Sequence, residues 1–368
     1  MDADLIVAIV VATALAFDFT NGFHDTANVV ATSISTRAMA PSIAVGYAAI
    51  LNFAGAFISL EVAATVAKDV VQVRAEPEFL LVVFGGLVGA IAWNLITWYF
   101  GLPSSSSHAL IGGMVGAAFV ADGTGAVKGD GVLGKVMVPA VVASVLAFIV
   151  AGLAILIVYR IVGGARPGPV TRGFRAGQVV SGGLLALAHG TNDAQKTMGV
   201  ITLALVANGT LPAVDFHVPS WVVIAAATAI AMGTYVGGWR IIKTMGSRII
   251  KMDPAQGFAA QGSGAAVILA ASHAGFPLST THTISGAVIG SGAAKRLSAV
   301  RWGVAGNIVI AWVLTLPAAA AIGGLTYALT RLFGTGALGP IVVSLAILAG
   351  AAFLFARRAQ SPAVGAEA

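Results

Sequence analysis

The chain has 368 residues, of which 58% are hydrophobic and only 9% are charged. A soluble domain carries about 25% charged residues, so this chain has too little polar side chain to cover a surface in water. The composition excludes a soluble globular enzyme and a disordered protein. The net charge of +6 does not indicate a nucleic-acid binder, because the basic residues stand in short loops beside apolar segments. The absence of cysteine excludes disulfides and thiolate metal sites. We therefore predict an all-α polytopic membrane protein.

Apolar segments of the length that a membrane span needs, about 20 residues, follow one another along the whole chain. The predicted spans cover residues 4–36, 42–63, 79–100, 104–121, 136–159, 178–206, 220–241, 257–273, 278–294, 303–330 and 338–356. As one helix, the first would exceed a hydrocarbon core of about 30 Å, so we expect a break in the polar run from Asp18 to Asn28. Segments 104–121 and 278–294 are short, and each is either a full span or one arm of a re-entrant hairpin.

The charges of the loops orient these spans. The chain starts with an acidic stretch, Met1–Asp4, whereas a cleavable signal peptide starts with positive charge, so we expect Leu5 to begin a permanent span. Basic residues are concentrated in the loops at 37, 160–175, 240–251, 295–301 and 357–358. The positive-inside rule places these loops in the cytoplasm. We expect a multi-pass protein of the cell (inner) membrane with its N-terminus outside, its C-terminus in the cytoplasm and the lipid bilayer as a partner. A homodimer is left open.

Two polar motifs occur twice, in the same order. Residues 21–28 and 189–196 share a glycine and an aspartate at the same spacing, and Pro103–His108 resembles Pro277–His282 in its proline, hydroxyl residues and histidine. Because the loop charges make the first copies start outside and the second copies inside, we predict an inverted repeat with a pseudo-two-fold axis in the membrane plane. The expected units are a first repeat at 1–160, a cytoplasmic Arg/Gly/Pro linker at 161–176, a second repeat at 177–331, and a terminal span with a short cytoplasmic tail at 332–368.

The first repeated motif places carboxylates inside the membrane. Asp25 and Asn28 share one helix face, and the second copy offers Asp193 and Lys196 at the same spacing. An ionised carboxylate at this depth is costly unless it is paired or coordinated, so these groups indicate either a Na⁺ site or a protonation site. A buried ion pair that only holds helices together is the competing interpretation. The candidate coupling residues are Asp25, Asn28, Asn192, Asp193 and Lys196, with Asn21, His24, Thr26, His189 and Gln195 in support.

A third carboxylate, Asp18, precedes this motif on the first span. The equivalent position in the second copy is Ala186, so the repeat does not support a function for Asp18. A functional role and a purely structural role are equally consistent with the sequence.

The second repeated motif has the sequence of a helix N-terminus. Proline followed by hydroxyl residues is typical of such a start, where free backbone N–H groups and the positive end of the helix dipole attract anions. Two such ends from opposite repeats would face each other near the midplane and bind an oxyanion. Simple capping of two membrane helices is the alternative. The candidate anion-binding residues are Ser104, Ser105, Ser106, Ser107, Ser279, Thr280 and Thr281, and we expect His108 and His282 to complete hydrogen bonds behind them.

At these motifs the sequence resembles the PiT family of inorganic phosphate transporters, and the resemblance extends over both halves of the chain. It implies a fold with broken helices and Pro-Ser/Thr half-helix or re-entrant hairpins, and an activity as a secondary active symporter of inorganic phosphate. The family's cation-binding carboxylates would fall on Asp25 and Asp193, with Asn28 beside them. Its phosphate-binding helix tips would fall on residues 105–107 and 279–281.

One departure from the family pattern bears on the coupling ion. Sodium-coupled members carry Asn-Asp-x-x-Asn in both copies, whereas here Lys196 stands in place of the last asparagine of the second copy. A fixed ammonium can replace one bound Na⁺, and the pattern is similar to bacterial low-affinity members that use protons or carry a metal–phosphate complex. We therefore favour H⁺ coupling with alternating access. Na⁺-coupled phosphate transport, with Na⁺ at Asp25, Asn28 and Asp193, and H⁺-coupled sulfate transport are the alternatives. No resident cofactor is expected, and a Mg²⁺–phosphate complex is an alternative substrate.

Two other classes compete with a transporter. An intramembrane serine hydrolase would use Ser107 or Ser279 with a histidine, but the duplicated hydroxyl runs show no oriented set of nucleophile and base. A passive anion channel would not need a buried aspartate pair, because the pair would repel the permeant anion.

Overall fold

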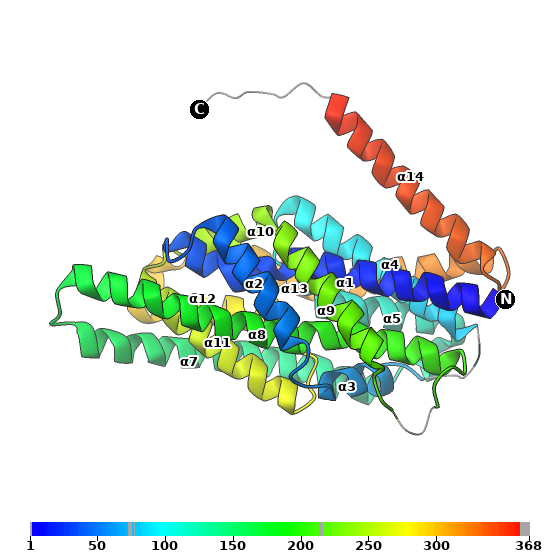
Figure 1. Ribbon diagram of the computed structural model, residues 1–368, viewed down its shortest axis with the longest axis horizontal. Coiled ribbons are helices and arrows are strands. Elements are labelled where there is room, and N and C mark those ends of the chain that lie inside the picture. Colours follow the sequence, from blue (N-terminus) through cyan, green and yellow to red (C-terminus); the bar gives the residue numbers. More distant parts are fainter. Residues whose placement is uncertain (1, 73–75, 77, 213–215, 361–368) are drawn as a thin grey trace.

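The computed structural model describes residues 2–72, 76, 78–212 and 216–360, and over these residues the chain is a bundle of helices without an extended β-strand. The longest helices run along the long axis of the bundle (Figure 1). The elements are α1 (Asp2–Ser35), α2 (Pro41–Gly55), α3 (Glu61–Asp69), α4 (Phe79–Phe100), α5 (Ser106–Asp122), η1 (Gly123–Ala126), α6 (Gly129–Gly131), η2 (Val132–Met137), α7 (Val138–Val162), α8 (Pro167–Ala207), α9 (Ser220–Val236), α10 (Trp239–Lys243), η3 (Thr244–Arg248), α11 (Pro254–His273), α12 (Thr280–Lys295), η4 (Leu297–Ala299), α13 (Trp302–Arg331) and α14 (Leu338–Gln360).

Five helical segments within the described residues are long and apolar enough to cross a membrane by themselves. They are Asp4–Ser35, Phe79–Phe100, Ser106–Ala126, Gly129–Val162 and Trp302–Arg331. A sixth candidate is bent, since α9 meets the segment formed by α10 and η3 at 60°. Large apolar side chains such as Val141 and Leu153 of α7 point outward, as a lipid-facing helix requires. The predicted all-α polytopic membrane fold is confirmed.

Helix α1 passes through the polar run from Asp18 to Asn28 without a break, so the predicted interruption of the first span is wrong. Helix α8 is likewise continuous through the second polar run. Lateral partners replace unwound backbone here: Thr26 Oγ1 donates to the Thr234 carbonyl of α9 at 3.2 Å, and the Asn28 amide donates to a hydroxyl of α12. The broken span lies elsewhere, between α9 and α10, where Gly237 has a φ of 74° that favours glycine.

Glycines of the first repeated motif let helices cross at close range. A Cβ added at Gly22 of α1 would lie 2.3 Å from the carbonyl oxygen of Ile230 in α9. One added at Gly190 of α8 would lie 2.1 Å from the carbonyl oxygen of Asn52 in α2. These two crossings are equivalent in the two halves, and they bring the polar faces of α1 and α8 into the centre of the bundle.

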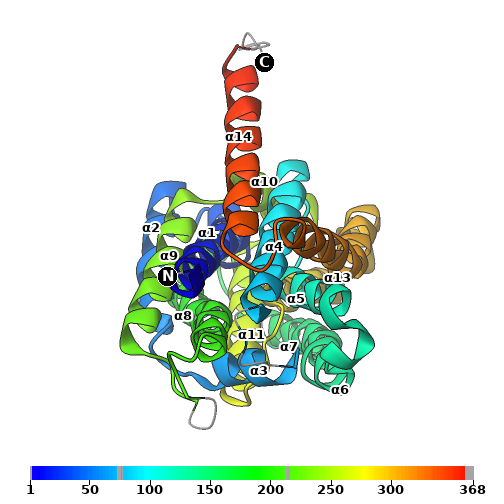
Figure 2. The same cartoon turned by 90° about the vertical axis from the view of Figure 1, so that its right-hand side faces the viewer.

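Two helical hairpins, α4–α5 and α11–α12, enter the bundle from opposite ends. The second arm of each packs against the last long helix of the other half. Helix α5 packs on α13 (Figure 2), and α12 packs on α7. A Cβ at Gly116 of α5 would lie 2.0 Å from the carbonyl oxygen of Ala320. A Cβ at Gly290 of α12 would lie 2.1 Å from that of Phe148. The two halves are therefore interlocked. Only residues 163–166 separate α7 from α8, so much of the segment predicted as a linker is helical.

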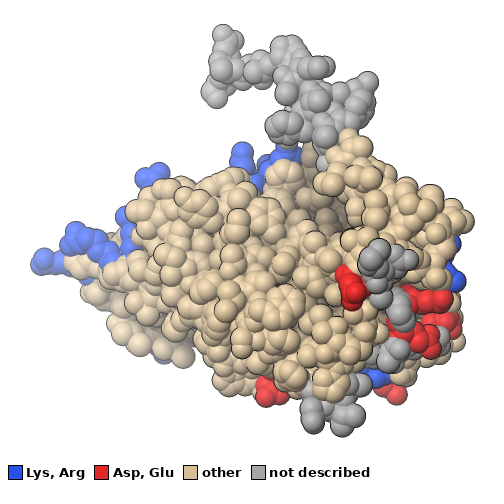
Figure 3. All heavy atoms as spheres, turned by 45° about the vertical axis from the view of Figure 1, so that its right-hand side comes forward, with Lys and Arg blue, Asp and Glu red and all other residues tan. Residues whose placement is uncertain are grey.

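Charged side chains lie mostly at the two ends of the bundle, with an uncharged belt between them (Figure 3). Acidic residues gather at the end that holds the N-terminus, called the acidic end below, and Lys and Arg dominate the other, the basic end. An ion pair closes the base of the α11–α12 hairpin, with Lys295 Nζ 3.1 Å from Asp253 Oδ2. At the acidic end, Arg331 Nη1 lies 3.7 Å from Glu78 Oε2, next to the start of α4.

Substitution of Gly116 by alanine is expected to destabilise the protein, because the added methyl group would meet the Ala320 carbonyl oxygen and force α5 away from α13. Overpacking of this kind costs about 1–3 kcal/mol. Gly306→Ala on α13 is the matched control, since nothing lies within 4 Å of its Cβ position. Thermal unfolding in detergent measures the difference. Equal melting temperatures of the two variants would contradict the close packing of α5 on α13.

Candidate functional site

The N-termini of α5 and α12 meet in the interior of the bundle. The residue just before each helix is a serine, Ser105 or Ser279, whose hydroxyl accepts a hydrogen bond from the backbone N–H three residues on, at 3.1 Å and 3.2 Å respectively. The two tips touch, because Ser107 Oγ donates to the carbonyl oxygen of Leu278 at 2.9 Å. Capping thus explains two of the predicted hydroxyls, and Ser106 Oγ is buried at the tip without a partner.

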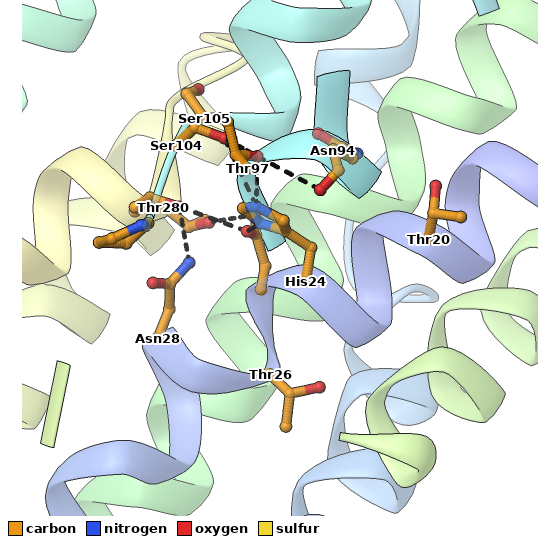
Figure 4. Close-up of polar contacts among 12 residues, drawn as sticks. Thr20, His24, Thr26, Asn28, Asn94, Thr97, Ser104, Ser105 and Thr280 are labelled. Carbon is orange, nitrogen blue, oxygen red and sulfur yellow. Dashed lines mark hydrogen bonds and ion pairs between the residues drawn. The ribbon is translucent and has the colours of Figure 1, made fainter. Parts of the chain in front are cut away.

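The tip of α12 faces a carboxylate of α1. Thr281 Oγ1 donates to Asp25 Oδ1 at 3.3 Å, and Thr280 Oγ1 donates to Asp25 Oδ2 at 3.5 Å. Asn28 Nδ2 donates to Thr281 Oγ1 at 2.9 Å, and His24 Nδ1 lies 2.7 Å from Asp25 Oδ1. Figure 4 shows His24, Asn28 and Thr280 pointing toward one another. The structure therefore brings these predicted residues of α1 and α12 together in one buried cluster.

His24 connects this cluster to the turn between α4 and α5. Its Nε2 lies 3.1 Å from Thr97 Oγ1 and 3.4 Å from Ser104 Oγ (Figure 4). Ser104 Oγ also donates to Thr97 Oγ1 at 2.8 Å. The imidazole thus ties the Asp25 carboxylate to the other hairpin.

Lys196 of α8 makes the equivalent contact at the tip of α5. Its Nζ donates to Ser107 Oγ at 2.5 Å, to Asp193 Oδ1 at 2.6 Å and to the Leu278 carbonyl oxygen at 2.9 Å. All three protons of the ammonium are therefore engaged. One tip is held by an ammonium on α8, whereas the other is held by the amide of Asn28 on α1.

Two carboxylates and an imidazole can converge on one cation between α1 and α8. One ligand atom each from Asp25, His189 and Asp193 lies within 4.8 Å of the others. His189 Nε2 is 3.4 Å from Asp193 Oδ2, but the pair lacks hydrogen-bond geometry and this carboxylate oxygen accepts no bond. A carboxylate oxygen without a donor suits either a proton or a hard cation such as Na⁺. His189, expected only as a supporting residue, thus joins the predicted aspartate pair.

Other predicted residues serve the scaffold. Gln195 Oε1 accepts two backbone N–H groups at the first turn of α3, at 2.8 Å and 3.3 Å. Asn192 Nδ2 donates to Ser272 Oγ of α11 at 2.8 Å. Thr26 points away from the cluster in Figure 4, and Asn21 belongs to a separate group of side chains described below.

The two motif histidines pack on each other behind the tips. The rings of His108 and His282 lie 4.7 Å apart at 84°, and His282 lies 4.1 Å from the ring of Trp312. The Nε2 atoms of both histidines make no hydrogen bond. The sequence predicts that they complete hydrogen bonds behind the site, but their rings instead pack on each other and, through His282, on Trp312 of α13.

Sequence reasoning missed three polar residues that support the site. Thr97 holds His24, Ser272 holds Asn192, and Asn52 Oδ1 lies 3.2 Å from His189 Nδ1. Thr97 and Asn52 are isolated polar residues within predicted apolar spans, and Ser272 stands at the end of one. Polar residues in such positions usually face another polar group, and this signal could have identified them.

These residues define a class of protein. Two positive helix ends with hydroxyl donors suit an oxyanion, and the carboxylates beside them suit a proton or a cation, which is the arrangement of a membrane transporter for small anions. The nearest approach to a hydrolase is the contact of Ser107 with Lys196. However, this ammonium is ion-paired with Asp193 and cannot accept a proton from the serine.

Comparisons with known proteins agree with this class. A sequence model of the phosphate transporter family matches residues 21–172 and 164–323. A protein of Mycobacterium bovis named "Probable low-affinity inorganic phosphate transporter" is 53% identical over 329 residues, which covers 89% of this chain and 78% of that protein. Proteins of the same name from Rhizobium meliloti and Bacillus subtilis are 50% and 45% identical, each over 89% of this chain and 98% of the relative.

A solved structure named "The sodium-dependent phosphate transporter" superposes with a TM-score of 0.78 at 25% identity, covering 89% of this chain and 99% of that one. The chain belongs to the phosphate transporter family. It is a transporter and not an enzyme, so the hydrolase alternative is excluded.

Lys196→Met is expected to destabilise the protein, because it leaves the Asp193 carboxylate buried without its ammonium partner. Removing one partner of a buried ion pair costs about 3–5 kcal/mol. The double variant Asp193→Asn, Lys196→Met should recover much of this loss, since no charge then stays unpaired. Thermal unfolding of the wild type, both single variants and the double variant in detergent gives the coupling. Strictly additive losses would contradict the ion pair.

Proposed function

We propose that the protein is a secondary active symporter that takes up inorganic phosphate together with protons. The relatives named as low-affinity inorganic phosphate transporters support the substrate. The observation that carries the coupling is the contact of Lys196 Nζ with Asp193 Oδ1 at 2.6 Å and with Ser107 Oγ at 2.5 Å. The ammonium stands where the other tip has the neutral amide of Asn28, so it supplies a fixed positive charge that a bound Na⁺ would otherwise supply. Because the similar solved structure is named sodium-dependent, Na⁺ coupling is the alternative.

Phosphate would bind between the two tips. Backbone N–H groups and the positive ends of two helix dipoles attract the anion, and the hydroxyls donate to its oxygens. The hydroxyls available there are those of Ser104, Ser106, Ser107, Thr280 and Thr281. Ser107 and Thr281 now bond to Lys196 and Asn28, so the arriving phosphate would exchange these contacts for its own.

Charge balance would couple phosphate to a cation. Phosphate near neutral pH carries about one to two negative charges. Asp25 and Asp193 add negative charge in the same buried region, and Lys196 offsets one. Surplus negative charge is costly in a medium of low dielectric constant, so anion binding there favours the uptake of a proton.

The paired hairpins supply a geometry for alternating access. The α4–α5 hairpin has its open side at the acidic end and the α11–α12 hairpin has its open side at the basic end, and their tips meet between α1 and α8. Movement of one tip away from the other would open the site to one end at a time. By the positive-inside rule we place the basic end in the cytoplasm and the acidic end outside a cell membrane.

In proteoliposomes, an imposed pH gradient is expected to drive accumulation of radiolabelled phosphate, whereas a Na⁺ gradient alone should not. Asp25→Asn and Asp193→Asn should each lower this accumulation by about tenfold or more, because each variant removes a carboxylate whose charge makes phosphate binding depend on proton uptake. Asp130→Asn, an exposed carboxylate at the acidic end, is the control.

Four outcomes would correct the proposal. If both aspartate variants accumulate phosphate at the wild-type level, the coupling scheme is wrong. If only a Na⁺ gradient drives accumulation, the coupling ion is Na⁺ and not H⁺. Sulfate uptake in place of phosphate changes the substrate, and a strict need for Mg²⁺ indicates a metal–phosphate complex.

Lys196→Asn is expected to convert the protein to Na⁺-stimulated uptake. The substitution removes the fixed charge and leaves the oxygens of Asp193, Ser107 and Leu278 facing a space that Na⁺ can enter. Phosphate uptake should then rise about tenfold or more when K⁺ is exchanged for Na⁺, while the wild type responds little. Uptake by Lys196→Asn that is active and indifferent to Na⁺ would contradict the role given to the ammonium.

A further inference from the structure

A second buried polar cluster lies beside the anion and cation site, and its side chains make no hydrogen bonds. Both carboxylate oxygens of Asp18, both amide atoms of Asn21 and of Asn94, and the hydroxyl of Thr197 are buried without a partner. All four residues have a solvent-exposed fraction of 0%. Buried polar side chains without hydrogen-bond partners are rare in folded proteins, so a cluster of them indicates a functional site.

The cluster lies between the site and the acidic end. Helices α1 and α4 both run from that end, and His24 of α1 lies 3.1 Å from Thr97 of α4. Asn21 and Asn94 stand three residues earlier on the same two helices, so their amides lie at the same level. Figure 4 shows Asn94 on the side of His24 that faces away from Asn28.

Asp18 stands one further turn toward the acidic end, about 10 Å along α1 from the central aspartate. The hydroxyl of Thr197 and the amide of Asn21 are close enough to act on its carboxyl, but neither forms a regular hydrogen bond to it. The charged groups that act on its carboxyl are Asp193 and Lys196, both on α8.

Asp18 differs from the other two buried aspartates. Asp25 accepts hydrogen bonds from two threonine hydroxyls and lies 2.7 Å from His24, and Asp193 is ion-paired with Lys196 at 2.6 Å. An ionised Asp18 would accept no regular hydrogen bond and touch no cation here, so it would carry much of the penalty of leaving water. A neutral carboxyl group avoids this penalty, so the surroundings of Asp18 favour its protonated form.

We propose that Asp18 binds the coupled proton, at a station that lies between the phosphate site and the acidic end. This assignment rests on the proposed H⁺-coupled phosphate uptake and names the group that carries the proton. The proton comes from water at the acidic end and forms an O–H bond with the Asp18 carboxylate. The same bond breaks when the proton leaves toward the basic end, and no other covalent change is needed. Because the equivalent position on α8 is Ala186, the station exists in one half only.

Lys196 would link proton binding to phosphate binding. Phosphate bound at the tips would attract the Lys196 ammonium, which also offsets the negative charge of an ionised Asp18. The added anion would also repel an ionised Asp18 directly. Phosphate therefore favours the protonated form, and by reciprocity a proton on Asp18 favours phosphate.

The test separates coupling from substrate binding. Asp18→Asn mimics the protonated carboxyl, so exchange of radiolabelled phosphate across proteoliposomes without a gradient should stay within about threefold of the wild type. Accumulation driven by a pH gradient should be lost. Asp18→Glu keeps a titratable carboxyl and should retain part of this accumulation, and the exposed Asp130→Asn should behave like the wild type in both assays.

The outcomes distinguish this proposal from the proposed function. If a pH gradient drives no phosphate accumulation by the wild type, both H⁺ coupling and the assignment of Asp18 are wrong. If a pH gradient drives equal accumulation by the wild type and by Asp18→Asn, only the assignment of Asp18 is wrong. Loss of gradient-free exchange in Asp18→Asn overturns it as well, because the carboxyl then belongs to phosphate binding. Loss of a Na⁺-driven uptake in this variant would assign the cluster to Na⁺.

Infrared difference spectroscopy gives a readout that does not depend on transport. The carbonyl stretching band of a buried protonated carboxyl should be present in the wild type, absent in Asp18→Asn and shifted in Asp18→Glu. Asp130→Asn should leave this band unchanged. Identical bands in the wild type and Asp18→Glu overturn the proposal even if Asp18→Asn fails to fold.

Discussion

Two helix N-termini face each other inside this protein, and the rest of the site compensates for their mutual repulsion. The first turns of α5 and α12 both present positive dipole ends to the same small volume. Asp25 offsets one of them by accepting hydrogen bonds from hydroxyls of α12. The tip of α5 faces the ammonium of Lys196, whose charge Asp193 balances. In the proposed function, an oxyanion that arrives between the tips takes over part of this compensation, which favours a proton or a cation at the surrounding carboxylates. The proposed anion binding and the proposed cation coupling thus have one physical origin.

Close helix crossings position these groups. Gly22 and Gly190 let α1 and α8 approach their neighbours so closely that a Cβ at either position would meet backbone. Gly116 and Gly290 do the same for the arms of the hairpins. Without side chains at these points, small movements of a whole helix are transmitted directly to the tips. The glycine content of the sequence therefore serves the geometry of the polar centre as well as packing in lipid.

The fold class and the meeting of the two tips could be predicted from the sequence, because polar residues that recur in apolar segments are costly in a membrane unless they face one another. The continuity of α1 could not, because the sequence predicted a break there. Polarity and length favoured it, but the helix is held by lateral partners such as Thr281, which belongs to a hairpin far along the chain. The same limit applies to Gln195, whose role depends on α3 being its neighbour. For Asp18 the sequence showed only a missing counterpart, and its lack of hydrogen-bond partners became visible in the packed structure.

The difference between Lys196 and Asn28 also bears on the direction of the transport cycle. In a carrier with two identical halves, rotation about the pseudo-two-fold axis would interchange the inward-open and outward-open states, which would then have equal free energies. Here the tip of α5 is held by a charged donor and the tip of α12 by a neutral one. Hydrogen bonds to ionised groups are roughly twice as strong as neutral ones. Under the alternating access proposed above, the empty carrier would rest preferentially in the orientation that preserves the α5 contact, and influx and efflux would begin from unequal barriers.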